Sequence, residues 1–361
     1  MSLDVLILED SSQAIFGGGQ RVTLEATRCI ESKFSFVLLD SSSQSWHRKI
    51  SKENGSVISL NLEAYFKYKA VFNFLLFFYS TWKIFWLQPI RLYVTTRKHL
   101  VTAVLAKCIR PKIKVVYHYH LIPPNSLSWH LYDIVTALIS TYIIFASEYT
   151  LSTYKKNRKE LSQRIKNKLL LCPPPPPKWK EEYFTTITLP TNPFIIGYAG
   201  KLANEKGILL FLEALKKLPP ELNWRGLIAG DGPLRTEVEN QCAKKEWKGK
   251  VEFLGQIETD ENFYQTLSIL VVPSFYSFES LGLTALEGLQ AGIPTLVSNT
   301  GNLSTFIANN NAHPLFKPDP EDIAKRISGL CNTMNSTRKI VKININRKNF
   351  TQFFRYIMTE A

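Results

Sequence analysis

Residues 269–298 read ILVVPSFYSFESLGLTALEGLQAGIPTLVS. Two short apolar runs, Ile269–Val272 and Thr295–Ser298, enclose a segment with helical spacing between Gly282 and Ala291. Parallel strands need a crossover connection between them, and a helix is the usual one. This stretch therefore predicts a strand, a helix and a second parallel strand of one sheet.

The same alternation extends along the rest of the chain. In the second half we expect strands at Phe194–Tyr198, Gly226–Ala229 and Val251–Leu254, and helices at Gly207–Lys217, Leu234–Lys245, Asn262–Leu267 and Pro320–Cys331. In the first half we expect strands at Asp4–Leu8, Phe34–Leu39, Leu92–Thr95, Lys114–His120 and Tyr142–Ala146, and helices at Gln20–Ile30, Leu100–Ile109 and Leu127–Leu138. The pattern predicts an α/β fold of two doubly wound, Rossmann-like domains that face a central cleft.

A run of prolines separates the two halves. Residues 172–178 read CPPPPPK, and consecutive prolines enter neither a helix nor a central strand. We therefore expect an N-terminal domain over 1–171, a proline-rich linker over 172–193 and a C-terminal domain over 194–331. Residues 332–361 are too few for another strand and helix of the same size, and we expect them to pack back on the N-terminal domain.

Composition is that of an ordinary folded protein. The 361 residues, 45% of them hydrophobic and 20% charged, suffice for two domains and exclude collagen-like and disordered chains. The five cysteines lie far apart, so the sequence has no CxxC pair and a cytoplasmic location is favoured. The beginning of the chain, MSLDVLILEDSS, has only a short apolar run with acids after it, which predicts neither a signal peptide nor a transit peptide.

Positive charge is concentrated in the first half. Of the formal net charge of +14, residues 1–190 contribute +12, and no carboxylate occurs between Glu63 and Asp133, where ten basic residues do. The helical stretch Ala70–Leu87 lies inside this region and is rich in Phe, Trp and Tyr. Two interpretations of it stay open, a helix in a membrane headgroup interface and a buried helix that covers a sheet. The charge favours an anionic partner, such as a membrane surface.

Two glutamates lie near the predicted start of the helix that follows Val272. Glu279 lies in the loop, and Glu287 lies inside the helix. The unpaired N–H groups of Ser280, Leu281 and Gly282 at a helix N-terminus suit an anion such as a diphosphate. Carboxylates accept hydrogen bonds from sugar hydroxyls and from a ribose diol.

This arrangement resembles the donor-binding signature of family 4 glycosyltransferases. The likeness consists of two glutamates with seven residues between them, Gly282-Leu283 after the first, and the Ala-Gly-Ile-Pro that ends at Pro294. The resemblance implies a GT-B fold and a retaining transfer of a sugar from a nucleotide diphosphate sugar to an acceptor hydroxyl. It also implies that Glu279 contacts the sugar and Glu287 the ribose.

Three further segments of the second half fit the same resemblance. Lys201 in GKL and Lys206 in EKG would neutralise phosphate charge, although the family more often has arginine at the first position. Gly230 lies in GDGP, which resembles a family loop, and also fits a plain strand-to-helix turn. Gln256 and Ile257 fall in the segment that meets the nucleobase in relatives.

The first half offers a glycine-rich loop and a histidine. Gly18 and Gly19 resemble the family's first loop, which faces the donor phosphates. His118 and His120 alternate at the end of a strand, so both lie on one face. No third ligand follows for a metal ion, and the family commonly has an active-site histidine here, with His120 the better match and His118 the alternative.

The function expected from these residues is a metal-independent hexosyl transfer. The two lysines and the helix N-terminus would stabilise the leaving diphosphate, with no cofactor besides the nucleotide sugar. UDP-glucose is favoured by family habit, and the charge favours a glycan or lipid-linked acceptor of cell-envelope or exopolysaccharide synthesis at the inner membrane face.

Two alternatives stay open. One is a nucleotide-sugar epimerase of the same architecture. The other is a non-catalytic, basic membrane- or glycan-binding protein with a degenerate transferase fold. A nucleic-acid partner is not expected, because no recognisable nucleic-acid module accompanies the basic residues.

Overall fold

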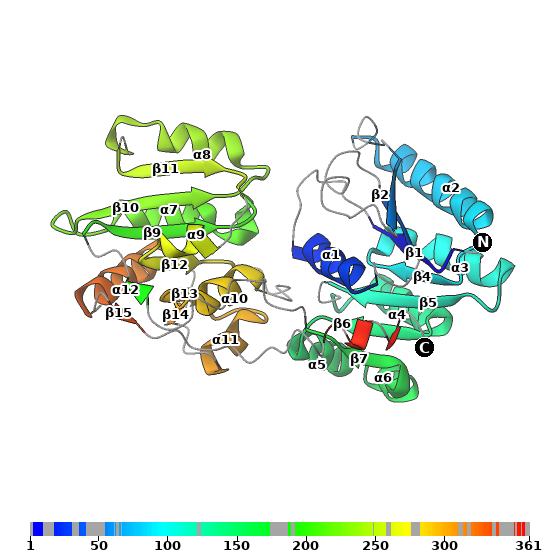
Figure 1. Ribbon diagram of the computed structural model, residues 1–361. Coiled ribbons are helices and arrows are strands. Elements are labelled where there is room, and N and C mark those ends of the chain that lie inside the picture. Colours follow the sequence, from blue (N-terminus) through cyan, green and yellow to red (C-terminus); the bar gives the residue numbers. More distant parts are fainter. Residues whose placement is uncertain are drawn as a thin grey trace. The chain divides into compact units, whose positions relative to one another are not determined.

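The computed structural model divides the chain into two compact units. Unit 1 comprises residues 1–175 and 346–361, and unit 2 comprises residues 176–345. The structure describes residues 3–9, 18–30, 36–40, 55–60, 62, 65, 67–120, 124–173, 187–188, 192–247, 249–257, 261–275, 282–309, 313–315, 319–333, 337–338, 350, 352–354 and 356–357. Each unit is built around its own parallel sheet (Figure 1).

Unit 1 contains a parallel sheet in the order β3-β2-β1-β4-β5-β6-β7. Its strands are β1 (Val5–Leu8), β2 (Phe36–Asp40), β3 (Gly55–Ser59), β4 (Arg91–Val94), β5 (Lys114–Tyr119), β6 (Tyr142–Phe145) and β7 (Leu169–Leu171). The strand order reverses between β1 and β4, where Leu6 lies opposite Leu92. In open α/β sheets, ligands bind beyond the carboxyl ends of the strands at such a reversal.

Helices cover both faces of the unit 1 sheet. They are α1 (Gly18–Ile30), α2 (Lys69–Leu87), α3 (Leu100–Ile109), α4 (Leu127–Ile139), α5 (Glu148–Asn157) and α6 (Lys159–Arg164), with short 3₁₀ turns η2 (Arg97–His99) and η3 (Lys166–Lys168). All four residues of β1 are fully buried, because alternate side chains point into different cores. Leu6 and Leu8 join the core that contains Ile84 of α2, and Val5 and Ile7 join the core that contains Leu24 of α1.

Unit 2 repeats the arrangement in the order β11-β10-β9-β12-β13-β14. Its strands are β9 (Phe194–Ala199), β10 (Trp224–Ala229), β11 (Val251–Gly255), β12 (Ile269–Val272), β13 (Thr295–Ser298) and β14 (His313–Leu315). Its helices are α7 (Ile208–Lys216), α8 (Arg235–Cys242), α9 (Glu261–Gln265), α10 (Leu283–Gln290), α11 (Leu303–Asn309) and α12 (Pro320–Thr333), with 3₁₀ turns η5 (Asn204–Lys206) and η6 (Lys245–Trp247). The two doubly wound parallel sheets confirm the predicted fold class.

The end of the chain is divided between the units. Thr337–Arg338 (β15) pairs antiparallel with Ile187–Thr188 (β8), and both strands belong to unit 2. Residues 346–361 belong to unit 1, where Phe350, Phe354 and Ile357 join the core on the α1 face. Figure 1 shows these red residues beside β6 and β7. The compact units place residues 332–345 in unit 2. The sequence analysis expected the whole segment 332–361 to pack on the N-terminal domain, because it recognised neither β8 nor β15.

Candidate functional site

Loops meet tightly at the carboxyl edge of the unit 2 sheet. Gly207, at the end of η5, has φ of +73°, and a Cβ there would collide with the carbonyl oxygen of Pro273 after β12. Gly230, after β10, has φ of +151°, and a Cβ there would collide with the carbonyl oxygen of Gly200. The absence of a side chain at these two positions brings the loops after β9, β10 and β12 together.

Hydrogen bonds fix these loops to one another. The Leu202 N–H donates to the carbonyl oxygen of Asp231 at 2.9 Å, and the Phe275 N–H donates to that of Glu205 at 3.2 Å. The Thr300 hydroxyl donates to the carbonyl oxygen of Ser274 at 2.9 Å. The loops that follow the four neighbouring strands β10, β9, β12 and β13 thus form one connected edge, which includes the strand-order reversal between β9 and β12.

Lys201 and Lys206 belong to this edge. Both are partly exposed, and the Lys201 ammonium lies 3.9 Å from the Glu205 carboxylate. The Tyr198 hydroxyl, buried below them, donates to the Lys201 carbonyl oxygen at 2.9 Å and holds that backbone in place. A partly exposed ion pair of this length contributes little to stability.

The helix α10 presents its N-terminus near the same edge. Gly282 has φ of +59° at the N-cap position and, as a glycine, has no side chain of its own to cap the helix. Glu287, 1% exposed, accepts a hydrogen bond of 2.6 Å from the Tyr264 hydroxyl of α9. Glu279, Ser280 and Leu281 lie outside the described residues.

Gly230, Gln256 and Ile257 are close neighbours along the edge. The Gly230 N–H donates to the carbonyl oxygen of Gly255 at 2.8 Å, so the turn after β10 contacts the end of β11. Gln256 and Ile257 follow directly and are exposed. The structure therefore places Lys201, Lys206, Gly230, Gln256 and Ile257 in loops at the carboxyl edge of the unit 2 sheet, whereas Glu287 lies buried in α10 against Tyr264.

In unit 1, the two histidines at the end of β5 have different surroundings. His118 is fully buried, its Nδ1 lies 2.5 Å from the Tyr93 hydroxyl, and its ring contacts Phe354. His120 is partly exposed as a residue, although both ring nitrogens are enclosed. The two ring centroids lie 4.3 Å apart.

Burial keeps both imidazoles neutral. It lowers the pKa of His118 well below its ordinary value of 6.5, with a further lowering by the neighbouring His120. It lowers the pKa of His120 to about 4. At neutral pH these rings can exchange hydrogen bonds, but they have no charge with which to attract an anion.

Gly18 and Gly19 form the first turn of α1 rather than a loop. The expectation of a glycine-rich loop at these two positions is therefore wrong, because the helix begins at Gly18. A Cβ at Gly19 would lie 3.5 Å from Cγ of His120, within ordinary van der Waals contact. The start of α1 thus lies against the candidate histidine.

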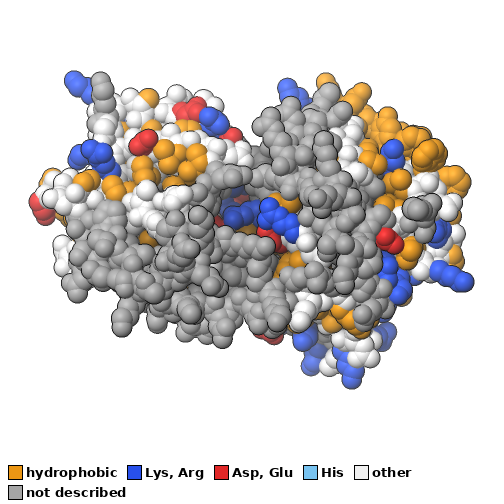
Figure 2. Space-filling model, viewed as in Figure 1, with side chains coloured by type: hydrophobic (Ala, Val, Ile, Leu, Met, Phe, Trp, Pro, Cys, Tyr) orange, Lys and Arg blue, Asp and Glu red, His pale blue; other side chains and the backbone are white. Residues whose placement is uncertain are grey.

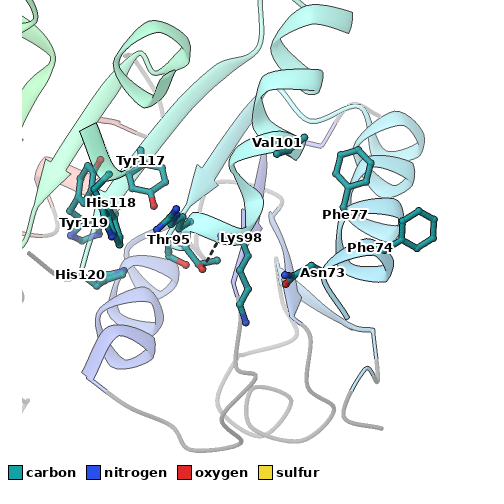
Figure 3. Close-up of a pocket in the computed structure, with 13 residues that line it drawn as sticks. Asn73, Phe74, Phe77, Thr95, Lys98, Val101, Tyr117, His118, Tyr119 and His120 are labelled. Carbon is teal, nitrogen blue, oxygen red and sulfur yellow. Dashed lines mark hydrogen bonds between the residues drawn. The ribbon is translucent and has the colours of Figure 1, made fainter. Parts of the chain in front are cut away.

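A pocket of about 720 Å³ opens beside His120 (Figure 3). It is lined by Asn73, Phe74, Phe77, Thr95, Thr96, Arg97, Lys98, Val101, Tyr117, His118, Tyr119, His120 and Trp129. The Arg97 guanidinium lies 4.6 Å from the ring centroid of Trp129, and the Lys98 ammonium lies 4.6 Å from that of Phe72. In Figure 3, Lys98 lies between Asn73 and His120.

The sequence analysis did not single out Arg97 and Lys98 as site residues. A signal was present, because TTRK follows a buried apolar strand directly, and polar residues after such a strand occupy the ligand-binding edge of a parallel sheet.

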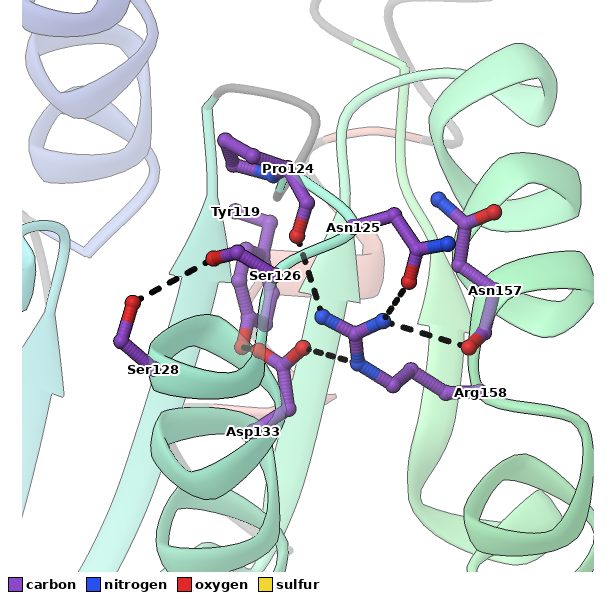
Figure 4. A network of polar contacts seen from close by, with 8 residues as sticks. All are labelled: Tyr119, Pro124, Asn125, Ser126, Ser128, Asp133, Asn157 and Arg158. Atoms are coloured by element: carbon purple, nitrogen blue, oxygen red, sulfur yellow. Dashed lines mark hydrogen bonds and ion pairs between the residues drawn. The ribbon is translucent and has the colours of Figure 1, made fainter.

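A buried polar network supports the segment after His120 (Figure 4). The Arg158 guanidinium donates to Asp133 at 2.8 Å, and the Tyr119 hydroxyl donates to the other oxygen of that carboxylate at 2.5 Å. Arg158 also donates to the carbonyl oxygen of Pro124 and to the Asn125 side chain. The chain just beyond the candidate histidine is thereby fixed to α4 and α5.

No metal centre is evident in the part of the chain that the structure describes. Among those residues, no group of three or more His, Cys, Asp or Glu side chains could hold a metal ion. His118 and His120 pair with each other without a third such ligand in this set.

Comparisons with known proteins agree with this architecture. A structure of HepE from Anabaena, in complex with UDP and glucose, superimposes with a TM-score of 0.76 at 15% identity over 99% of this chain and 100% of that one. The fold is therefore GT-B, as the sequence analysis expected.

The second half also matches a family model. Residues 180–347 match the model for glycosyl transferases group 1. An uncharacterized glycosyltransferase of Methanocaldococcus jannaschii is 31% identical over 151 residues, which cover 40% of this chain and 38% of the relative. An N-acetyl-D-galactosaminyltransferase of Campylobacter jejuni, whose name specifies a glycan on PP-undecaprenol, is 28% identical over 41% of each chain. The matches thus span less than half the length of these relatives.

Proposed function

We propose that the protein is a family 4 glycosyltransferase that moves a hexose from a nucleotide diphosphate sugar to an acceptor hydroxyl. The observation that supports this most is the match of residues 180–347 to glycosyl transferases group 1, which covers the unit that contains Lys201, Lys206 and Glu287. We take UDP-glucose as the favoured donor. HepE, a protein of the same fold, binds UDP and glucose.

The proposed reaction retains the anomeric configuration. The bond between the anomeric carbon and the diphosphate oxygen breaks, and that oxygen keeps the electron pair. The acceptor oxygen then bonds to the same face of the anomeric carbon, and its proton passes to the leaving diphosphate. Lys201, Lys206 and the N-terminus of α10 stabilise the departing negative charge, so we propose that no metal or further cofactor takes part.

The remaining site residues bind and orient the donor. Glu287 accepts hydrogen bonds from the ribose and Glu279 from the transferred sugar, while Gly230, Gln256 and Ile257 lie toward the nucleobase. Ser280, Leu281 and Gly282 offer backbone N–H groups to the diphosphate. Neutral His120, which lies near the start of α1, contributes a hydrogen bond to the reacting sugar.

The proposed acceptor is a glycan or a lipid-linked glycan of cell-envelope or exopolysaccharide synthesis. The excess of basic residues in the first half and the Campylobacter relative support this acceptor class. The location that follows is the cytoplasm, with peripheral contact to the inner face of the membrane. No nucleic-acid partner is proposed.

A thermal-shift panel of UDP, GDP, ADP and their common sugars tests the donor site. A ligand at 100 times its dissociation constant stabilises the folded state by about 2.7 kcal/mol, and we expect that shift with the UDP compounds. The variants Lys206→Ala and Glu287→Gln should show no such thermal shift. Lys216→Ala is the matched control, because Lys216 lies at the far end of α7 and pairs with Glu213.

The outcomes separate the alternatives. If no nucleotide caused a thermal shift, the non-catalytic binding protein would be the remaining alternative. A shift followed by interconversion of UDP sugars, without transfer to an acceptor, would instead identify an epimerase.

A further inference from the structure

Helix α2 buries one narrow stripe of side chains and exposes the opposite one. Phe72, Leu76, Ser80 and Ile84, spaced by four residues, are buried against unit 1. The opposite stripe, here called the α2 face, consists of Val71, Phe74, Phe78, Trp82, Phe85 and Trp86. Phe85 is 67% exposed and Trp86 is 72% exposed. Figure 2 shows this gathering of hydrophobic side chains at the upper right, where α2 lies in Figure 1.

The apolar surface continues from α2 onto α3. Exposed Val101 lines the 720 Å³ pocket together with Phe74. Exposed Ile109 lines a second cavity, of about 170 Å³, together with Phe85. Exposed apolar side chains on soluble proteins are ordinarily scattered singly, so a continuous surface of this kind indicates an interaction site.

The segment of the chain that contains α2 and α3 has charged side chains of one sign. No carboxylate occurs between Glu63 and Asp133, and Asp133 is buried against Arg158. Lys67 and Lys69 are exposed at the start of α2, and Lys112 is exposed after α3. Lys83 lies within α2, with its ammonium 4.7 Å from the ring centroid of Trp82. An aromatic face with cations at its margins complements an anionic lipid surface rather than a basic or neutral protein.

The buried stripe of α2 determines the orientation in which this helix could contact a membrane. Within the described residues, α2 is the one helix long and apolar enough to cross a bilayer by length and composition. However, Phe72, Leu76 and Ile84 belong to the cores of unit 1, and a crossing would remove them from those cores. The helix therefore has only its outer face to offer a bilayer, in the orientation of a helix that lies in the interface plane.

We propose that the α2 face docks unit 1 on the surface of an anionic lipid bilayer. The aromatic side chains lie at the boundary between headgroups and acyl chains, and the flanking lysines contact lipid phosphates. Phe74 and Val101 belong both to this surface and to the pocket beside His120, so the pocket opens toward the bilayer. This last point rests on the proposed function, because it makes the pocket the entrance for a lipid-linked acceptor.

Flotation of the full chain with lipid vesicles, without nucleotide, tests the docking. We expect binding to vesicles that contain phosphatidylglycerol and much weaker binding to phosphatidylcholine alone. Phe85→Ser with Trp86→Ser should weaken binding at least about tenfold, and Lys83→Gln should weaken it about fivefold. Tyr356→Ser is the matched control, because Tyr356 is a half-exposed aromatic residue next to core residues on the opposite face of the same sheet.

Three results would overturn the proposal. They are equal binding to both kinds of vesicle, full binding by the double variant, and a dimer in solution that the double variant dissociates while neither protein binds vesicles. The last result would assign the α2 face to a second copy of the chain. Thermal unfolding of the variants, measured without vesicles, shows whether they are folded. Thermal shift by nucleotide, measured separately, keeps a failure of docking distinct from a failure of the proposed function.

Discussion

At the scale of single residues, Arg158 stands out because its charged side chain is 1% exposed. It pairs with Asp133, which is fully buried. A buried ion pair contributes little net stability over apolar residues of similar volume, but the loss of one partner leaves an uncompensated charge. The pair therefore makes the fold sensitive to changes at either residue.

We expect Arg158→Ala to lower the free energy of unfolding by about 3–5 kcal/mol, measured by urea denaturation. Arg235→Ala is the control, since Arg235 forms exposed ion pairs with Asp231 and Glu239 that contribute little to stability. Equal effects of the two substitutions would contradict the role given to burial.

The two histidines predict a dependence of stability on pH. Their pKa values are lowered in the folded state, so below about pH 6.5 the unfolded chain binds protons that the folded chain does not. Stability is thus fully present above that pH and is lost as the pH falls toward 4, by at most about 1.4 kcal/mol per pH unit for each histidine. His120→Gln should reduce this slope in denaturation curves between pH 4 and 7. If the slope for His120→Gln were no smaller than the slope for His130→Gln, His120 would not be a source of this pH dependence.

At the scale of the elements, the strands that the sequence analysis missed in the two large sheets are edge strands. The central strands were predicted because both of their faces are buried, as in VLIL of β1. The strand β14 contains Pro314, which cannot donate to a ladder and is tolerated at the edge of a sheet. The outer strand β3 reads GSVIS, with only two apolar residues, and β7 has only three residues. Such segments lack the length or the apolar run that sequence patterns need.

The candidate site was predictable to the extent that it lies in loops after strands. Lys201, Lys206 and Gly230 were found through the family resemblance, in segments that follow apolar runs in unit 2. The contact between Gly19 and His120 was not predictable, because it joins residues a hundred positions apart. For α2, the sequence left open a buried helix and an interfacial one, and the structure gives the helix both a buried and an exposed face.

Gly207 joins two of the loops, and its substitution should separate them. Gly207→Ala places a Cβ against the carbonyl oxygen of Pro273 and imposes a strained φ, so we expect a loss of about 1–3 kcal/mol in stability and a weaker nucleotide-induced thermal shift. Gly329→Ala, in α12 with open space around it, should be neutral or stabilising by up to about 1 kcal/mol. Equal stabilities of the two variants would show that the loop contact is unimportant.

At the scale of the whole molecule, the residues after 345 complete the core of the first unit. Phe354 is fully buried with Tyr93 and His118 around it. We expect Phe354→Ala to cost about 3–5 kcal/mol and to make unit 1 the first to unfold in limited proteolysis. Tyr356→Ala, at a half-exposed position, should cost much less. If the two variants were equally destabilised, the packing of Phe354 would not be important for the stability of unit 1.

The same packing has a consequence for synthesis on the ribosome. Domains generally fold in the order in which they are made, but here unit 1 obtains Phe350, Phe354 and Ile357 only after all of unit 2 has been translated. Unit 1, whose synthesis begins first, is then the last unit to complete its core. A nascent chain halted near residue 345 would hold a complete second unit beside an unfinished first one, with the apolar groups that Phe354 covers still open to solvent.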